Sequence, residues 1–231
     1  MIAPKGSDGP RVRLWDIGVR VTHGGFIILL PALWWSWKTG DMEWHKLFGI
    51  IMLGLVAFRI LWGLVGSSTA RFSRFVRGPA AIFAYLRGGT NDEQPLPVGH
   101  NPLGGWSVIV MLSLLGFQVA TGLIAQDVDG LESGPLNHLV SYETADAARA
   151  VHGLIFNILL ALIALHICAI FYYTVVRRDS LIAPMITGFR RFSGRIIEPV
   201  MASPLRLIMC ITFAAALASW ISNGAPLPQG E

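Results

Sequence analysis

The most restrictive feature of this chain is a long uncharged stretch bounded by Arg149 and Arg177. From Ala150 to Val176 it contains no Asp, Glu, Lys or Arg, and most of its residues are apolar. A run of this length suits a helix that crosses a lipid bilayer with some tilt. The composition agrees, because the chain is 53% hydrophobic and only 14% charged, whereas a soluble domain carries about 25% charged residues.

Four other stretches are long and apolar enough to cross a bilayer. The first lacks the small-residue cleavage site of a secretory leader, so we expect no cleaved signal peptide. The predicted spans, with their flanking turns, are residues 14–38, 44–66, 103–125, 149–176 and 205–222. We therefore predict an all-α fold, an integral membrane helical bundle. Between the second and third spans the pattern predicts short amphipathic helices, broken at Gly78-Pro79.

The charges of the connecting segments predict the orientation of the chain. The segment 126–148 has no Lys or Arg but contains five acidic residues, whereas the N-terminal segment and the connections 67–101 and 177–204 are basic. Because positive loops stay on the cytoplasmic side, we expect a cytoplasmic N-terminus and a periplasmic C-terminus. The pI near 9.4 follows from this topology and does not indicate a nucleic-acid partner.

Four histidines fall within or at the ends of the predicted spans. His152 and His166 are fourteen residues apart, which places them within roughly 40° of each other on a helix and roughly 21 Å apart along it. The alternating direction of the spans then brings His45 to the depth of His152 and His23 to the depth of His166. Ionisable groups inside a bilayer usually face the bundle interior and mark a functional site.

Two imidazoles that face each other across a bundle suit the axial ligation of a b-type haem. We predict His45 and His152 as ligands of an outer haem iron and His23 and His166 as ligands of a haem iron nearer the cytoplasm. The chain has no C-x-x-C-H motif, which excludes covalent c-type attachment. The predicted cofactors are therefore two haem b groups.

Haem propionates need cationic partners, and an Arg-x-x-His pattern occurs twice, at Arg20 and at Arg149. Residues three apart are neighbours on a helix, so both arginines are candidates, with Lys46 beside His45. Arg20 would need an anion if the first helix began near Arg13 and carried it into the span. Arg59 lies deep in the second span and either snorkels to the interface or meets an anion inside the bundle.

Other interpretations of the histidines remain. Buried histidines can simply hydrogen-bond between helices. A zinc site is disfavoured because no Asp, Glu or Cys clusters with either pair. His100 is either a structural residue at the start of the third span or a proton or quinone contact. His138, in the outer loop, is either solvated or part of a partner surface.

These residues resemble the bacterial cytochrome b561 family, which includes the cytochrome b subunits of nickel-dependent hydrogenases. The resemblance covers roughly residues 11–190 and leaves the fifth span outside. The motifs that carry it are Arg20-Val-Thr-His23, Trp44-His45-Lys46, the segment 71–79, Tyr85-Leu86-Arg87, the segment 100–105 and the His152/His166 spacing. It implies two haem b groups on the four histidines and electron transfer between a quinone pool and a redox partner.

The expected organisation is a cytoplasmic N-terminal tail at 1–13, a four-helix di-haem domain at 14–190 and a C-terminal segment at 191–231 that holds the fifth helix. We expect an inner-membrane electron-transfer subunit of a respiratory chain, serving a periplasmic cytochrome c, dehydrogenase or hydrogenase, rather than a self-contained enzyme. Alternatives are a stand-alone superoxide:quinone oxidoreductase, although an acidic outer surface repels superoxide, and a haem-free membrane anchor.

Overall fold

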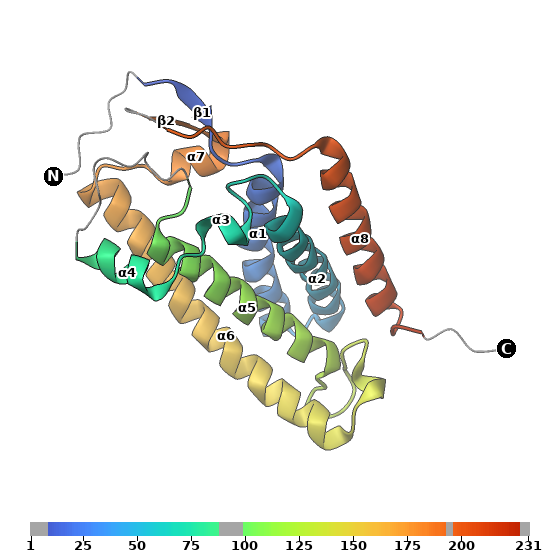
Figure 1. Ribbon diagram of the computed structural model, residues 1–231. Coiled ribbons are helices and arrows are strands. Elements are labelled where there is room, and N and C mark those ends of the chain that lie inside the picture. Colours follow the sequence, from blue (N-terminus) through green and yellow to red (C-terminus); the bar gives the residue numbers. More distant parts are fainter. Residues whose placement is uncertain (1–8, 88–98, 193–195, 227–231) are drawn as a thin grey trace. The chain divides into compact units, whose positions relative to one another are not determined.

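The computed structural model describes residues 9–87, 99–192 and 196–226. Five helices in this part of the chain are long and apolar enough to cross a membrane, and they dominate Figure 1. They are α1 (Ile17–Thr39), α2 (Met42–Val65), α5 (Pro102–Ile124), α6 (Tyr142–Phe171) and α8 (Pro204–Ser222). The prediction of an all-α membrane helical bundle is confirmed.

Helix α6 differs most from its predicted span. It begins at Tyr142, seven residues before the expected start at 149, and continues as a π-helical turn, η2 (Tyr172–Val176). Residues 142–149 include Glu143, Asp146 and Arg149. A hydropathy pattern detects only the part of a helix that is apolar enough for the bilayer, so this charged first part escapes it.

Several helix starts have an identifiable cause. The Asp16 carboxylate accepts a hydrogen bond from the Val19 N–H at 2.9 Å and caps α1. The Asn101 side chain does the same for the Gly104 N–H at 2.6 Å and caps α5. Pro102 and Pro204 open α5 and α8, where the missing proline N–H removes no helical hydrogen bond.

Short elements connect the long helices. Two short helices lie between α2 and α5, as predicted, namely α3 (Phe72–Phe75) and α4 (Pro79–Leu86), and α4 begins at the predicted break. A 3₁₀ turn, η1 (Asn137–Leu139), precedes α6, and α7 (Ile182–Thr187) follows it. A two-stranded antiparallel sheet pairs β1 (Arg11–Arg13) with β2 (Phe189–Arg191). No pattern in the sequence predicts this sheet. Its first strand lies at the end of the expected tail, of which residues 1–8 lie outside the described residues.

The chain forms two compact units, each drawn from three stretches of sequence. The first unit comprises Met1–Val21, Ile60–Val110 and Ala164–Leu207, and the second comprises Thr22–Arg59, Met111–Ile163 and Ile208–Glu231. The domain boundaries at 13 and 190 that we expect from the sequence stay a prediction.

A buried polar network ties the first unit together around the start of α1. Trp62 donates its indole N–H to both carboxylate oxygens of Asp16 at 3.0 Å. The Thr69 hydroxyl donates to the Leu14 carbonyl at 2.8 Å. The backbone N–H groups of Leu14 and Trp15 both donate to the Gly188 carbonyl. Chain segments far apart in sequence therefore fix where α1 begins.

The second unit has an apolar interior contributed by α1, α2, α5, α6 and α8. Its buried side chains include Met52, Val56, Leu115, Ile155 and Leu159. Outside this interior the spans remain exposed. In the most apolar 18-residue window of each span, only 11% to 33% of the residues are buried in the protein. Such large exposed apolar surfaces are what a lipid environment requires.

Candidate functional site

The second unit brings two of the four predicted haem ligands together. His45, in the first turn of α2, and His152, in the third turn of α6, have ring centroids 6.4 Å apart and ring planes inclined by 74°. Both side chains are half-buried. No group of three or more His, Cys, Asp or Glu that could hold a metal occurs among residues 9–87, 99–192 and 196–226. Within these residues, the His45/His152 pair therefore has no further His, Cys, Asp or Glu ligand beside it.

The two rings are oriented by the same arrangement. His45 Nδ1 lies 2.9 Å from the Leu33 carbonyl, and His152 Nδ1 lies 2.9 Å from the Gln118 carbonyl. In each case a hydroxyl residue three positions after the acceptor donates to the same carbonyl: Ser36 to Leu33 at 3.1 Å, and Thr121 to Gln118 at 2.9 Å. A carbonyl oxygen has two lone pairs and can accept more than one bond.

This arrangement determines which nitrogen is available on each ring. Nδ1 donates its hydrogen to a carbonyl, so Nε2 carries the free lone pair. In the described part of the chain, neither Nε2 has a hydrogen-bond partner. A hydrogen bond on the second nitrogen is the usual way to orient a metal-bound imidazole and to raise its basicity.

The separation of the rings fits one iron between them. Two metal–imidazole bonds of about 2 Å each place the nitrogens of opposed ligands about 4 Å apart, and the ring centroids lie farther apart than the nitrogens. The observed centroid distance of 6.4 Å agrees with this arrangement. Space for a flat group exists at Gly49, one turn after His45, where an added Cβ would meet no atom within 4 Å. The donor set and the spacing therefore fit a bis-histidine haem.

Gly122 allows the approach of His152. A Cβ at this position would lie 2.9 Å from Cε1 of the His152 ring, which is closer than real Cβ atoms come. Gly122 also follows Gln118 by one helical turn, so α5 provides both the acceptor and the space for the ring. No sequence pattern indicates this role of Gly122, because it lies on a different helix from either histidine.

The other predicted pair does not fall within one unit. His23 lies in the second turn of α1 and belongs to the second unit, whereas His166 lies in α6 and belongs to the first unit. Both side chains are half-buried. Their pairing remains a prediction from sequence spacing.

The four predicted cationic partners have different surroundings. Lys46 forms an ion pair with Glu132 at 2.7 Å, and Arg149 forms one with Asp146 at 2.6 Å. Arg20 lies in the first turn of α1 and donates to the carbonyls of Met185, at 3.2 Å, and Ile186. Arg59 is only 6% exposed, so it packs inside the protein rather than along its surface. Their role toward propionates stays a prediction.

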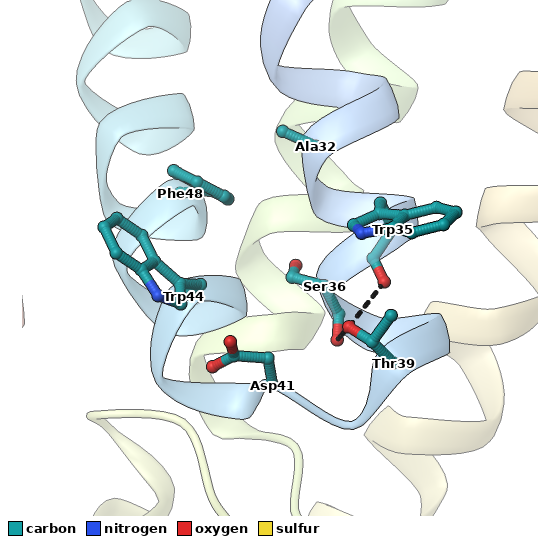
Figure 2. Close-up of a pocket in the computed structure, with 7 residues that line it drawn as sticks. All are labelled: Ala32, Trp35, Ser36, Thr39, Asp41, Trp44 and Phe48. Carbon is teal, nitrogen blue, oxygen red and sulfur yellow. Dashed lines mark hydrogen bonds between the residues drawn. The ribbon is translucent and has the colours of Figure 1, made fainter.

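A pocket of about 320 Å³ adjoins His45 at the turn between α1 and α2. Figure 2 shows Trp44 and Phe48 of α2 on one side and Trp35, Ser36 and Thr39 of α1 on the other. Trp35 and Trp44 are 63% and 52% exposed, as expected of aromatic residues at a membrane–water interface. Ser36 lines this pocket and also lies 3.4 Å from Nδ1 of His45. One residue that lines this interfacial pocket, Ser36, is thus in contact with His45, the predicted iron ligand.

The first unit contains a polar cluster that the sequence analysis missed, formed by Tyr85, Tyr173 and Asn101. The two hydroxyl oxygens are 2.6 Å apart, and Asn101 Nδ2 donates to both, at 3.0 and 3.2 Å. Burial, followed by the hydrogen bond with Tyr173, raises the pKa of Tyr85 to about 12. The Tyr85 hydroxyl therefore stays protonated at physiological pH. Tyr173 lies in the π-helical turn η2, a feature that is frequent at functional sites.

His100 and His138 lie in different surroundings. The His100 ring packs between Trp15 and Phe75, with centroid distances of 4.8 and 4.6 Å. This favours the structural interpretation, although Asn101 rather than His100 caps α5. His138 is exposed in η1.

Comparison with known proteins gives a single match. A model of the family described as prokaryotic cytochrome b561 matches residues 14–188, which is more than half of the chain. The match contains all four predicted ligand histidines and ends before α8 begins at Pro204. Searches of curated proteins and of solved structures gave no match.

Proposed function

Because the chain belongs to the prokaryotic cytochrome b561 family and is therefore a membrane cytochrome b of electron transfer, we propose that it carries electrons through two haem b groups. These groups would connect the quinone pool with a periplasmic redox partner, either a cytochrome c or a dehydrogenase or hydrogenase subunit. We propose residues 14–190 as the haem domain and residues 191–231 as a segment that adds one span.

The observation that carries this proposal is the arrangement of His45 and His152. The ring centroids lie 6.4 Å apart, and a backbone carbonyl orients each ring through Nδ1. These contacts engage Nδ1 of each ring and leave Nε2 as the nitrogen that can ligate a metal. Bound between such imidazoles, haem iron accepts and releases one electron at a time.

We propose His23 and His166 as the ligands of the second haem, on the strength of the fourteen-residue spacing in α6 and of the positions within the family match. Arg20, Arg149, Lys46 and Arg59 are our candidates for propionate partners. Because the segment 126–148, which leads to His152, has no Lys or Arg and five acidic residues, we place the His45/His152 pair on the periplasmic side.

We place the quinone head group at the Tyr85/Tyr173/Asn101 cluster. Only one of the two tyrosine hydrogens can lie between the hydroxyl oxygens, so the other must point elsewhere. Among the described residues it has no acceptor. A quinone carbonyl is an acceptor of the right chemistry, and Tyr173 of the cluster, in η2, follows His166 by seven residues.

The content of haem per chain tests this proposal. We expect two haem b per full-length wild-type chain in a pyridine haemochrome assay, and one after either His45→Ala or His152→Ala. The double variant should still hold one, because both residues would serve the same iron. Combining His45→Ala with His166→Ala should leave none. His138→Ala is the matched control and should retain two.

Each competing function predicts a different result. Retention of two haems by His45→Ala, or loss of both by the His45→Ala/His152→Ala variant, would contradict the shared site. A colourless wild-type protein from haem-replete cells would favour the haem-free anchor. Consumption of superoxide with quinone as the sole acceptor would favour the superoxide:quinone oxidoreductase.

A further inference from the structure

The connection between α5 and α6 exposes apolar side chains outside the membrane-spanning helices. The most exposed are Val128 and Leu131, at 72% and 84%. Leu139 and the first residue of α6, Tyr142, are exposed as well. Apolar residues that are exposed together beyond the lipid-facing spans mark an interaction site. The proposed electron transfer gives these residues no role.

The two most exposed of these residues are the first and last of a tight hairpin tip, residues 128–131. The Asp127 N–H donates to the Glu132 carbonyl at 2.8 Å and closes the hairpin. Gly130 has a φ of 70°, a left-handed conformation that glycine adopts without steric cost. The backbone therefore holds both apolar side chains at one exposed turn.

The hairpin is anchored on the end of α5. The Gly134 N–H donates to the Ala125 carbonyl at 2.9 Å, just beyond the last residue of the helix. A Cβ on Gly134 would collide with the Gly122 carbonyl. The same Gly122 gives space to the His152 ring. The chain thus returns against the turn of α5 that contacts a predicted haem ligand.

An ion pair also joins the hairpin to α2. Glu132, which follows the hairpin tip, pairs with Lys46 at 2.7 Å, and Lys46 directly follows His45. All these residues belong to the second unit. The hairpin tip is therefore attached close to both members of the His45/His152 pair.

The charges around the hairpin tip are mostly negative. Residues 38–46 and 126–149, both in the second unit, contain seven Asp or Glu but only three Lys or Arg, although the whole chain has a net charge of +4. Two of the three cations already form ion pairs with carboxylates of these segments. Four exposed carboxylates have no ion-pair partner among the described residues, and we call them the acidic rim: Asp41, Glu43, Asp129 and Glu143.

This combination favours a protein partner over the bilayer. Segments that lie in the lipid interface carry Lys or Arg beside their apolar residues, and the hairpin has neither. An apolar centre with a charged rim is the usual arrangement of a protein–protein interface, and a negative rim requires a positively charged partner. Redox partners bind through such small, electrostatically steered interfaces, because their complexes must form and separate quickly.

We propose that the hairpin tip and the acidic rim form the docking surface for the periplasmic redox partner, and that this partner is a soluble electron carrier whose redox centre is surrounded by lysines. The proposal rests on the proposed function, because the surface adjoins the predicted outer haem ligands. With the carrier seated on the hairpin tip, one electron passes between the two proteins, so that one redox centre is oxidised as the other is reduced.

Binding of a basic c-type cytochrome to the full-length protein tests this surface. The protein would be held in nanodiscs of phosphatidylcholine, a lipid without net charge that does not itself attract the cytochrome. We would compare the Kd and the association rate of wild type, Val128→Ser/Leu131→Ser and Asp41→Asn/Asp129→Asn over a range of salt concentrations. Stopped-flow absorbance would follow electron transfer from the reduced protein to the oxidised cytochrome.

Ile197→Ser/Glu198→Gln is the matched control. Ile197 is also 72% exposed and Glu198 is exposed, but both belong to the first unit. A second control is the same cytochrome with its lysines succinylated, which reverses their charge. Circular dichroism and the haem-to-protein ratio would show that each variant folds.

The two variants should weaken binding in different ways. Val128→Ser/Leu131→Ser should raise the Kd about tenfold and keep the salt dependence of wild type, because it removes only apolar contacts. Asp41→Asn/Asp129→Asn should slow association several-fold at low salt and match wild type at high salt, where charges are screened. The control variant should behave as wild type, and the succinylated cytochrome should not bind.

A spin label on the hairpin tip separates a protein partner from the bilayer. Leu131→Cys would be labelled in a Cys168→Ala/Cys210→Ala background, which removes both cysteines of the chain. We expect the label to be accessible to a water-soluble nickel reagent and to lose this accessibility when the cytochrome binds. A label that is accessible to oxygen but not to nickel before the cytochrome is added would place the tip in lipid and overturn the proposal.

Two further results would overturn it. The first is an equal Kd for wild type and Val128→Ser/Leu131→Ser. The second is unchanged binding of the succinylated cytochrome. Binding requires no electron transfer, so these results are independent of the haem-stoichiometry test. A protein that binds the cytochrome through the hairpin tip but holds no haem would contradict the proposed function and leave the docking surface in place.

Discussion

The two compact units use buried polar groups for different purposes. In the first unit, Asp16 and Trp62 bond to each other and to backbone at the start of α1. In the second unit, Ser36 and Thr121 bond to carbonyls that also hold the rings of His45 and His152. Polar groups position a helix in one unit and two candidate ligands in the other.

The difference teaches where substitutions should affect folding and where they should affect redox properties. A buried hydrogen bond that defines a helix start contributes to stability, because its loss leaves a donor unsatisfied. A hydroxyl that shares an acceptor with a ligand imidazole contributes little to stability but changes how strongly that imidazole donates to a metal. Variants in the two units should therefore separate these effects.

The largest effect is expected from Asp16→Ala. It removes the cap of α1 and leaves the indole N–H of Trp62, which is 2% exposed, without its acceptor. We expect a loss of about 2–4 kcal/mol in the free energy of unfolding, measured by thermal or denaturant unfolding in detergent with circular dichroism. Protein that does fold should keep its haem-to-protein ratio.

Asp41→Ala is the matched control, because Asp41 is exposed in the turn between α1 and α2. It should change stability by less than about 0.5 kcal/mol. The stability loss of Asp16→Asn should lie between those of Asp16→Ala and Asp41→Ala, because the amide oxygen can still accept one hydrogen bond. Equal stability of Asp16→Ala and wild type would contradict the structural role that we assign to the hydrogen bonds of Asp16 with Val19 and Trp62.

The next effect concerns the quinone. Tyr85→Phe removes a hydroxyl from the Tyr85/Tyr173/Asn101 cluster, and the loss of one hydrogen bond of about 1 kcal/mol should raise the KM for a short-chain quinone about fivefold. The value of kcat and both haem absorption bands should stay unchanged. Steady-state quinone reduction or quinol oxidation would measure this.

Tyr172→Phe provides the comparison, because Tyr172 lies next to Tyr173 but is 48% exposed and outside the hydrogen-bonded cluster. It should leave the KM unchanged. If Tyr172→Phe and Tyr85→Phe had the same KM, the quinone would have to bind elsewhere.

Hydropathy and spacing revealed the five helices and one histidine pair that meets in space, but not the contacts that orient the pair. Leu33 and Gln118 act through backbone carbonyls, which every residue possesses, so no side-chain pattern identifies them. The β1–β2 sheet joins residues 11–13 to residues 189–191, and strands this short leave no period in the sequence. The ion pair of Lys46 with Glu132 likewise depends on the fold of a loop.

A third prediction uses this ion pair. If Lys46 acts on the outer haem, Lys46→Met should lower its midpoint potential and Glu132→Gln should raise it, each by on the order of tens of millivolts, because a nearby positive charge stabilises the reduced iron. Stability should change little, since both side chains are more than a third exposed. A potentiometric titration of the purified protein measures both shifts.

Lys38→Met is the control, because Lys38 lies at the exposed end of α1 and packs against Trp37. It should leave the potential unchanged. Shifts of the same sign in Lys46→Met and Glu132→Gln would mean that the ion pair acts through structure rather than charge.

The smallest effect is expected from Ser36→Ala and Thr121→Ala. Each hydroxyl donates to the carbonyl that accepts from a histidine Nδ1. Its removal frees that carbonyl to accept more strongly from the imidazole N–H, which makes the ring a better donor to iron and stabilises the oxidised state. Both variants should therefore lower the outer midpoint potential, by on the order of 10 millivolts each.

The two hydroxyls lie on different helices but share one geometry, because each donates to the carbonyl and also lies 3.2 to 3.4 Å from the histidine Nδ1. A common sign of the two shifts is therefore the informative result. Thr39→Ala is the matched control: its hydroxyl donates to the Trp35 carbonyl in the same manner, but that carbonyl accepts from no histidine. It should leave the potential unchanged. Opposite shifts in Ser36→Ala and Thr121→Ala would show that the rings are not tuned by their acceptors, and the orientation of each imidazole would then depend on packing alone.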